Sequence, residues 1–205
     1  MAYFPFFIEL GGREGLIVGG GAVALRKVEK LLPYGPKLTV LAPEILPEFK
    51  KMDSITCLEI PFTPAALQGK DFVIAATDDA MLNQSIAQAC QARHILVNVV
   101  DDPENCGFLF PALVKQGQLC VGISTGGASP SAAVYVKNRV AECLPENMEA
   151  ILDYLSAIRQ QVKEALPEGC RGAVFKALFD ACMDAGRPLT ETELDALLCK
   201  EVRPC

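Results

Sequence analysis

A glycine-rich loop between an apolar segment and an amphipathic segment constrains the fold of this chain more than any other feature. Residues 19–24 read Gly-Gly-Gly-Ala-Val-Ala, which fits the pattern G-x-G-x-x-A. The loop follows the apolar segment 15–18, and the next segment, 22–32, carries its apolar residues at helical spacing. A strand, this loop and a helix in that order are typical of the first unit of a dinucleotide-binding sheet.

The positions of the glycine loop have separate roles in such a unit. Gly19 permits the tight turn, Gly21 lets a pyrophosphate approach the backbone, and Ala24 keeps the helix close to the sheet. Free N–H groups at the helix start, including those of Ala22 and Val23, would bind the phosphates with the help of the helix dipole. The alternative is a structural turn without a ligand. The complete order of strand, loop and helix favours a bound dinucleotide.

Strands and helices alternate through the first hundred residues. Further strands are predicted at 37–41, 55–60, 71–76 and 95–100, with a second helix at 79–92. Near-continuous apolar strands of this kind suit a parallel sheet that helices cover on both faces. The sequence therefore predicts a doubly wound sheet of the Rossmann type.

The pattern changes after Pro103. Strands are predicted at 108–113 and 119–124 around a turn at Gln116-Gly117, and Pro130 is placed to start a helix. From Ser131 onward only helices are expected, with breaks at Pro145, at 167–169 and at 186–188. The predicted fold class is thus α/β, with a Rossmann-type parallel-sheet domain at 1–112, a two-stranded arm and its following helix at 113–145 and a small all-helical C-terminal domain at 146–205. The two apolar strands would otherwise leave an exposed edge, so we expect a homodimer formed through residues 108–144.

The composition of the chain restricts the kinds of partner that the protein can bind and the cellular compartment in which we expect it. The net charge of −6 argues against nucleic acid as a partner, because a phosphate backbone needs a basic surface. No apolar run reaches the ~20 residues that a membrane span needs. None of the nine cysteines forms a C-x-x-C pair, so no bound metal is expected. The odd number of cysteines and the absence of an export signal favour a cytoplasmic protein with reduced thiols.

The end of the strand 37–41 bears on the choice of cofactor. An acid that binds the ribose is expected about 20 residues after the glycines. Here Pro43 and Glu44 follow the strand, and Glu44 is the only acid nearby. No arginine stands there to bind the 2′-phosphate of NADP, so the sequence favours NAD, with Pro43 and Glu44 among its contacts.

Polar residues follow three other predicted strands. They are Thr77 and Asp78, Asn98 and Asp101, and Thr125 and Gly126. Ligands of open α/β sheets bind at the carboxyl ends of the strands, so we expect these residues to line the crevice for the nicotinamide, with Thr77 and Asp78 touching the cofactor. Each has a structural alternative as a helix cap or a turn residue.

A nucleotide-binding fold does not by itself identify the reaction. One class of enzyme can be excluded: a short-chain dehydrogenase needs a tyrosine with a lysine four residues later, and no tyrosine of this chain has one.

Several motifs taken together resemble a known family, the precorrin-2 dehydrogenase / sirohydrochlorin ferrochelatase family, which also forms the amino-terminal part of siroheme synthase. The matching residues span 5–130 in the order and spacing of that family. They are Pro5-Phe-Phe-Ile-Glu-Leu10, Leu16-Ile-Val-Gly-Gly-Gly-Ala-Val-Ala24 with Arg26-Lys27, Ala75-Ala-Thr-Asp-Asp79 with Asn83, Val97-Asn-Val-Val-Asp-Asp102, Phe108–Pro111, and Ile123-Ser-Thr-Gly-Gly-Ala-Ser-Pro130.

The resemblance implies an enzyme that oxidises precorrin-2 to sirohydrochlorin in siroheme biosynthesis, with NAD as the hydride acceptor. It also implies that 113–145 is a strand–helix dimerisation segment between the Rossmann domain and the helical C-terminal domain. Asp101 matches the aspartate tied to activity in the family, and Thr125 matches a hydroxyl at the active site. Asn98 and Gly126 are expected beside them as substrate-binding residues. Lys137 stands where the family usually has an arginine, which is a departure from the family pattern. Lys137 is expected to bind a substrate carboxylate, and Lys115 and Arg139 are further candidates.

Three alternatives stay open beside the dehydrogenase. The same site could also insert iron or cobalt into sirohydrochlorin, as a ferrochelatase. The chain could be a chelatase that does not oxidise. It could also be a non-enzymatic NAD-sensing module; such modules usually place an acid directly at the end of the second strand and lack a Ser-Thr-Gly-Gly-x-Ser-Pro loop, whereas this chain shows the reverse on both counts.

Overall fold

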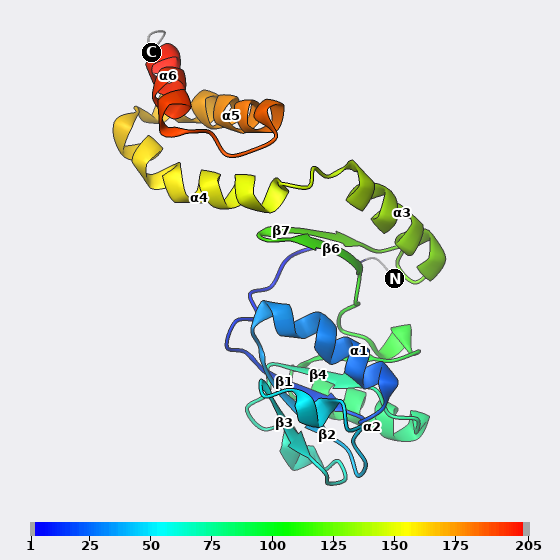
Figure 1. The fold of residues 1–205 in the computed structure, drawn as a ribbon. Helices are drawn as coiled ribbons and strands as arrows, with labels where there is room; N and C mark the ends of the chain where they lie inside the picture. The colour runs from blue at the N-terminus through cyan, green and yellow to red at the C-terminus, as the bar shows by residue number, and fades with distance from the viewer. Residues whose placement is uncertain (1–2, 203–205) are drawn as a thin grey trace. The chain divides into compact units, whose positions relative to one another are not determined.

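The computed structural model describes residues 3–202, and their side chains up to residue 199. The chain divides into two compact units, Met1–Phe110 and Pro111–Cys205. Each unit is described by itself below, with the labels of Figure 1. The predicted three-part division at 112/113 and 145/146 stays a prediction.

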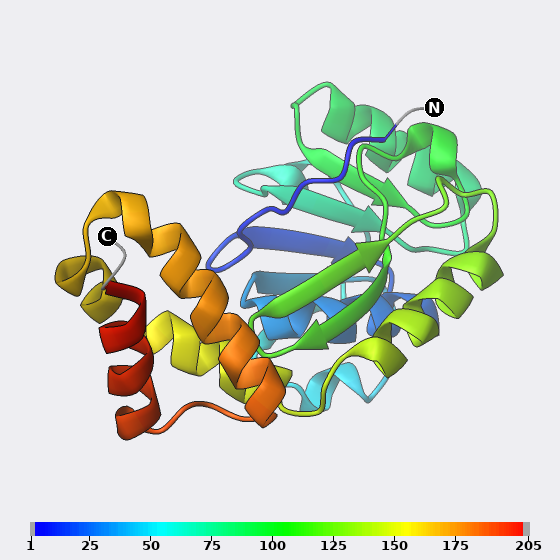
Figure 2. The same ribbon diagram turned by 90° about the horizontal axis from the view of Figure 1, so that it is seen from above.

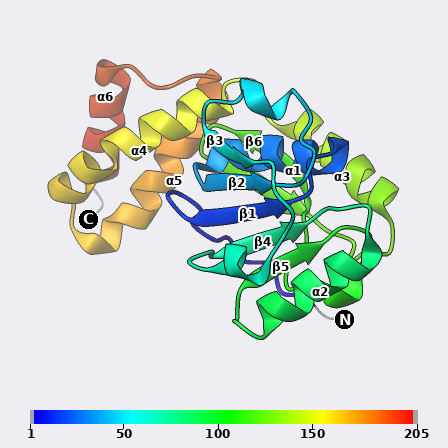
Figure 3. The same ribbon diagram turned by 90° about the horizontal axis from the view of Figure 1, so that it is seen from below.

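The first unit is built on one five-stranded parallel sheet. Its strands lie in the order β3-β2-β1-β4-β5, as Figure 3 shows. The elements are β1 (Glu14–Val18), α1 (Ala22–Leu31), β2 (Lys37–Leu41), β3 (Ile55–Leu58), β4 (Phe72–Ala75), α2 (Ala80–Gln91) and β5 (Leu96–Val99), with short 3-10 turns at η1 (Leu32–Tyr34), η2 (Phe49–Lys51), η3 (Pro64–Leu67) and η4 (Pro103–Asn105). The prediction of a doubly wound Rossmann-type sheet is confirmed.

Side-chain alternation along the strands explains why helices cover both faces of the sheet. Leu16 and Val18 of β1 point to one face and pack with residues of α2, whereas Ile17 points to the other face and packs with residues of α1. All three residues are at most 2% exposed. Strands buried on both faces cannot alternate polar and apolar residues, which accounts for the apolar runs in the sequence.

One predicted strand is misplaced. The segment 108–113 was expected to be extended and paired, but the strand β6 runs over Ala112–Gln116. Phe108 and Phe110 instead pack against the α1 side of the sheet in the first unit. Pro111 has no N–H to donate to a ladder, and two aromatic rings gain more by burial against an existing core than by lying on a two-stranded hairpin.

The second unit begins with a hairpin and continues with helices. β6 pairs antiparallel with β7 (Leu119–Ile123), and Gly117 adopts a positive φ of 53° at the turn. The helices are α3 (Pro130–Cys143), α4 (Met148–Ala165), α5 (Glu168–Ala185) and α6 (Glu191–Val202). α5 contacts both α4 and α6, as Figure 2 also shows, and their apolar faces form a small core. The predicted helix breaks and the helix start at Pro130 are confirmed.

Two further observations concern the whole described chain. Within residues 3–202, none of the helices combines the length and the apolar character that crossing a bilayer requires. Cysteines 57, 90, 106, 143, 182 and 199 are free thiols, whereas Cys170 is disulfide-bonded, which differs from the expectation of reduced thiols.

Candidate functional site

The glycine loop lies against the backbone that follows β2 and β4. Gly19 adopts a φ of +128°, and a Cβ there would overlap the carbonyl oxygen of Ala76. A Cβ on Gly20 would overlap the carbonyl oxygen of Glu44. Gly19 N–H donates to Leu41 O at 3.0 Å. The first two glycines are therefore required by the protein itself, because only glycine allows this close backbone approach.

Gly21 differs from its two neighbours. It is the N-cap of α1 with extended backbone, and no described atom lies within 4 Å of the place where its Cβ would be. No side chain among the described residues caps the helix. The N–H groups at the start of α1, including those of Ala22 and Val23, lie at the positive end of the helix dipole, where Gly21 and Ala22 are exposed. Such a helix start suits a pyrophosphate.

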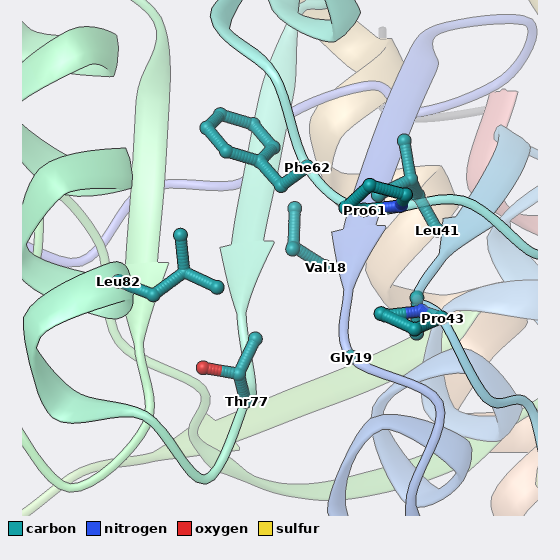
Figure 4. A pocket seen from close by; sticks show the side chains of 9 residues that line it. Val18, Gly19, Leu41, Pro43, Pro61, Phe62, Thr77 and Leu82 are labelled. Carbon is teal, nitrogen blue, oxygen red and sulfur yellow. The ribbon is translucent and has the colours of Figure 1, made fainter.

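An apolar cavity of about 270 Å³ lies beside this loop, at the carboxyl ends of β1, β2 and β4. Figure 4 shows its lining, which consists of Val18, Gly19, Leu41, Ala42, Pro43, Pro61, Phe62, Thr77 and Leu82. Ligand pockets in proteins are apolar with a few polar groups and have volumes of about 300–1,000 Å³. The cavity therefore suits an apolar ring system that forms part of a larger ligand, as the adenine of a dinucleotide does.

The cavity contains some of the predicted cofactor residues and not others. Gly19, Pro43 and Thr77 line it, whereas Glu44 and Asp78 are exposed residues outside the lining. Sequence reasoning missed Pro61 and Phe62, which follow β3. Their position directly after a predicted strand was the available signal, but only polar residues were sought at the strand ends.

The end of β4 is fixed by a buried amide. Asn83 of α2 is 6% exposed; its Oδ1 accepts from the Thr77 hydroxyl at 2.8 Å, and its Nδ2 donates to Thr77 O at 3.0 Å. Asp79 is the N-cap of α2 and accepts from the N–H groups of Met81 and Leu82. The helix cap after β4 is therefore Asp79 and not its neighbour Asp78. Thr77 is held rigidly where it lines the cavity.

The end of β5 carries two aspartates in different situations. Asp102 caps η4: its Oδ1 accepts from Asn105 N–H at 3.3 Å and its Oδ2 from Asn105 Nδ2 at 2.7 Å. Asp101 is exposed and has a left-handed backbone with a φ of +60°. That conformation is uncommon for residues other than glycine and costs free energy, although aspartate tolerates it better than most. The turn therefore presents the Asp101 carboxylate to solvent while Asp102 stabilises the turn.

Asn98 of β5 is one of the few buried polar residues and is 4% exposed. Its Nδ2 donates to Phe108 O at 3.0 Å, and its Oδ1 accepts from Lys27 Nζ at 3.3 Å. Both ends of the predicted substrate-binding amide are therefore occupied by groups of the same unit.

Lys27 of α1 is a further residue that the sequence analysis did not assign to the site. Lys27 is half-buried, with Nζ 3.8 Å from the centre of the Phe110 ring. Burial, reinforced by the nearby charge of Lys30, lowers the pKa of Lys27 from 10.5 to about 8, although Cys106 and Asp101 act in the opposite direction. Helix periodicity could not reveal this, because the covering ring comes from the segment after β5.

The remaining predicted residues belong to the second unit. The Thr125 hydroxyl accepts from Ser129 N–H at 3.1 Å and can donate to Ser129 O, and Ser129 in turn caps α3. Gly126 is exposed at a φ of +63° and has open space around it. Lys137 lies half-buried on α3. The expected convergence of these residues with the strand ends of the first unit stays a prediction.

The comparisons with known proteins agree with the dinucleotide geometry. Residues 6–112 match the family model NAD_binding_7, described as "Putative NAD(P)-binding". The chain is 40% identical over 167 residues to siroheme synthase 2 of Aeromonas hydrophila, covering 81% of this chain and 36% of that protein. It is 39% identical over 208 residues to siroheme synthase of Thioalkalivibrio sulfidiphilus, covering 95% and 42%. The chain therefore spans about two fifths of the length of these relatives.

A solved structure shares the fold of the chain. The structure of "SirC, precorrin-2 dehydrogenase" superposes with a TM-score of 0.76 at 21% identity, covering 97% of this chain and 98% of that one. The family model matches more than half of the 205 residues, and it confirms the prediction of an NAD(P)-type cofactor. The chain belongs to this NAD(P)-binding family, as the resemblance of its motifs to the siroheme synthase family indicated.

Proposed function

We propose that the chain is an NAD-dependent dehydrogenase that oxidises precorrin-2 to sirohydrochlorin. The observation that carries the proposal is the glycine loop beside an apolar cavity, in a chain similar to siroheme synthases over most of its length. The name of the structurally similar dehydrogenase points to the same reaction. The relatives are much longer, so the activity of this chain is inferred from the part that it shares with them.

NAD fits the site better than NADP. The cavity is bounded at the end of β2 by Pro43, and no arginine follows that strand to bind a 2′-phosphate. The start of α1 would bind the pyrophosphate, and the apolar cavity would hold the adenine. When bound, NAD supplies a hydride acceptor.

Asp101 is the proposed catalytic residue. Oxidation converts precorrin-2 and NAD⁺ into sirohydrochlorin, NADH and a proton, so one C–H hydrogen leaves as hydride and another hydrogen leaves as a proton. The Asp101 carboxylate stands at the end of β5 and can accept that proton, then release it to solvent because the residue is exposed. Asp102 is tied to Asn105 and is the weaker candidate.

The second unit would bind the carboxylates of the substrate. The start of α3, with the open loop around Gly126, offers backbone N–H groups, and Lys137 adds a positive charge. Thr125 would hold this loop in shape through Ser129. We also propose that the protein acts in the cytoplasm as a homodimer formed through residues 108–144.

An anaerobic assay with enzymatically prepared precorrin-2 and NAD tests the proposal. We expect NADH absorbance to rise together with the sirohydrochlorin spectrum, and the rate to fall when NADP replaces NAD. A chain that binds NAD but forms no NADH would be a sensing module instead. A parallel reaction measures metal insertion into sirohydrochlorin with Co²⁺ or Fe²⁺, corrected for the spontaneous rate. It decides whether this chain, like an enzyme that makes siroheme as the names of its relatives indicate, also inserts a metal.

A further inference from the structure

A lysine held inside the first unit is unusual enough to require an explanation. Lys27 Nζ donates to Asn98 Oδ1 at 3.3 Å and lies 3.8 Å from the centre of the Phe110 ring. Its partners among the described residues are thus an amide oxygen and an aromatic face rather than a carboxylate in ion-pair contact. Removing an ammonium group from water is costly unless it is well compensated. A lysine kept in this place at such a cost is a candidate for a role in the site.

The hydrogen bonds of Asn98 connect Lys27 to the turn that carries Asp101. Asn98 Nδ2 also approaches Cys106 Sγ at 3.5 Å. The Cys106 sulfur accepts from Val99 N–H at 3.2 Å, and its thiol can donate to Val99 O at 3.2 Å or to Asp102 O at 3.3 Å. Cys106 thereby closes the loop 99–106 across its base. Asp101, with its left-handed backbone, lies within this loop.

The charges around Lys27 come from two elements. Arg26 and Lys30 belong to α1 itself and disfavour its protonated form. Asp101 and the Cys106 thiol belong to the loop after β5 and favour it. Asp101 is the one carboxylate among these groups, and its negative charge favours the protonated form of Lys27.

We propose that Lys27 is a positioning residue for Asp101: with Asn98 and Cys106 it holds the left-handed turn in shape, and its positive charge attracts the Asp101 carboxylate into the position from which it accepts a proton from the substrate. This inference rests on the proposed dehydrogenase function and adds a residue of α1 to the site. Lys27 acts through Asn98 and through its charge, and it does not touch the reacting atoms.

The inference has a specific consequence for the pH dependence of turnover. Because the pKa of Lys27 is lowered to about 8, its charge is lost as the pH rises through that value. Turnover should therefore fall on the alkaline side of pH 8. Lys27→Arg keeps the charge at all these pH values, since a guanidinium does not deprotonate in proteins and can stack on Phe110.

The main experiment compares three variants of the full chain by kcat and KM for precorrin-2 between neutral and alkaline pH. Lys27→Met should lower kcat about 10-fold or more at neutral pH, as misplaced catalytic groups do, and should lose the alkaline fall. Lys27→Arg should keep most of the activity and also lose the alkaline fall. The matched control is Lys30→Gln, an exposed lysine of the same helix. It should keep kcat at neutral pH and move the alkaline fall to higher pH, because Lys30 helps to lower the pKa of Lys27.

A second measurement does not depend on turnover. In protein labelled with ¹³C-lysine, the signal that disappears in Lys27→Arg should titrate near pH 8. Asp101→Asn should move this titration to lower pH, because the Asp101 charge favours protonated Lys27. Unchanged titration in Asp101→Asn overturns the inference, and so does a Lys27→Met variant that keeps the wild-type kcat and pH profile. If the wild-type chain forms no NADH, the dehydrogenase proposal fails, and the role of Lys27 in that reaction fails with it. The electrostatic link between Lys27 and Asp101 is tested separately, by the titration alone.

Discussion

The two ends of the sheet crevice in the first unit are built in contrasting ways. At the ends of β1, β2 and β4, glycines and apolar side chains surround a cavity, and the only hydroxyl in its lining, that of Thr77, is bound by Asn83. At the end of β5, a lysine, an amide and a thiol form a half-buried polar network around an exposed aspartate. The first arrangement can bind a ring and a pyrophosphate but has no group that moves a proton. The second has such groups, so we expect nucleotide binding and proton transfer to be separated along the sheet.

The strongest test of this separation is Asp101→Asn. Asparagine tolerates the left-handed backbone at least as well as aspartate, so the variant should fold and bind NAD as the wild type does. Because it removes the proposed proton acceptor, turnover of precorrin-2 should fall at least ~100-fold. Steady-state NADH formation and calorimetric NAD binding measure the two effects.

The matched control is Asp102→Asn, which lies in the same turn. Asparagine can still cap η4, so only a few-fold change in turnover is expected. Equal losses in the two variants would mean that the turn needs its shape and not the Asp101 carboxylate.

The complementary test disturbs the nucleotide side. Gly21→Val should leave folding intact, because no described atom occupies the place of its Cβ, but the side chain would stand where the pyrophosphate approaches. We expect NAD affinity to fall at least ~10-fold, about 1.4 kcal/mol, with an unchanged melting temperature. Calorimetry and thermal denaturation give both values, and wild-type affinity in the variant would refute the assignment of the loop to NAD.

Gly19→Ala provides the contrast within the same loop. Its Cβ would overlap the carbonyl oxygen of Ala76 at a backbone conformation that disfavours side chains, so this variant should lose stability whether or not NAD is present. A melting temperature lowered in Gly19→Ala and unchanged in Gly21→Val would separate the glycine that the fold needs from the glycine that the ligand needs.

The contrast between the two sides also explains what the sequence could predict. The nucleotide side depends on contiguous residues: the loop 19–24, and the ends of the strands that follow it, are visible as local patterns. Pro61 and Phe62 were missed because apolar residues after a strand give no signal until their position beside the cavity is known.

The network at β5 is assembled from three separate segments, which is why it was predicted only in part. Asp101 and Asn98 are polar residues at a predicted strand end, but the burial of Lys27 involves the Phe110 ring, which comes from a distant segment. The same segment, 108–110, was expected to belong to a strand. Because the aromatic segment 108–110 was assigned to a strand, the burial of Lys27 on α1 could not be predicted.

The smallest predicted effect is on the stability of the protein, and it comes from Lys27 in the polar network at the end of β5. The folded pKa of Lys27, about 8, lies below its ordinary value of 10.5, so between these values the unfolded chain binds more protons than the folded one. This residue therefore makes the wild type less stable below pH 8, and that cost disappears as the pH rises towards 10.5. Lys27→Met removes the cost but leaves Asn98 Oδ1 without its donor, which costs about 1 kcal/mol.

Since Lys27 is only half-buried, solvent screening reduces the charge term to roughly 1 kcal/mol, and the two contributions nearly cancel at neutral pH. The pH dependence of the difference is therefore the quantity to measure. Urea unfolding of Lys27→Met and wild type at a series of pH values should show the variant losing stability relative to wild type as the pH rises from 8 to 10.5. Lys30→Gln, at an exposed position, should show a much weaker trend. A constant difference in the free energy of unfolding between Lys27→Met and wild type over this range would mean that Lys27 is solvated in the folded protein. The β5 side of the first unit would then hold no half-buried charge, and this contrast with the nucleotide side would be lost.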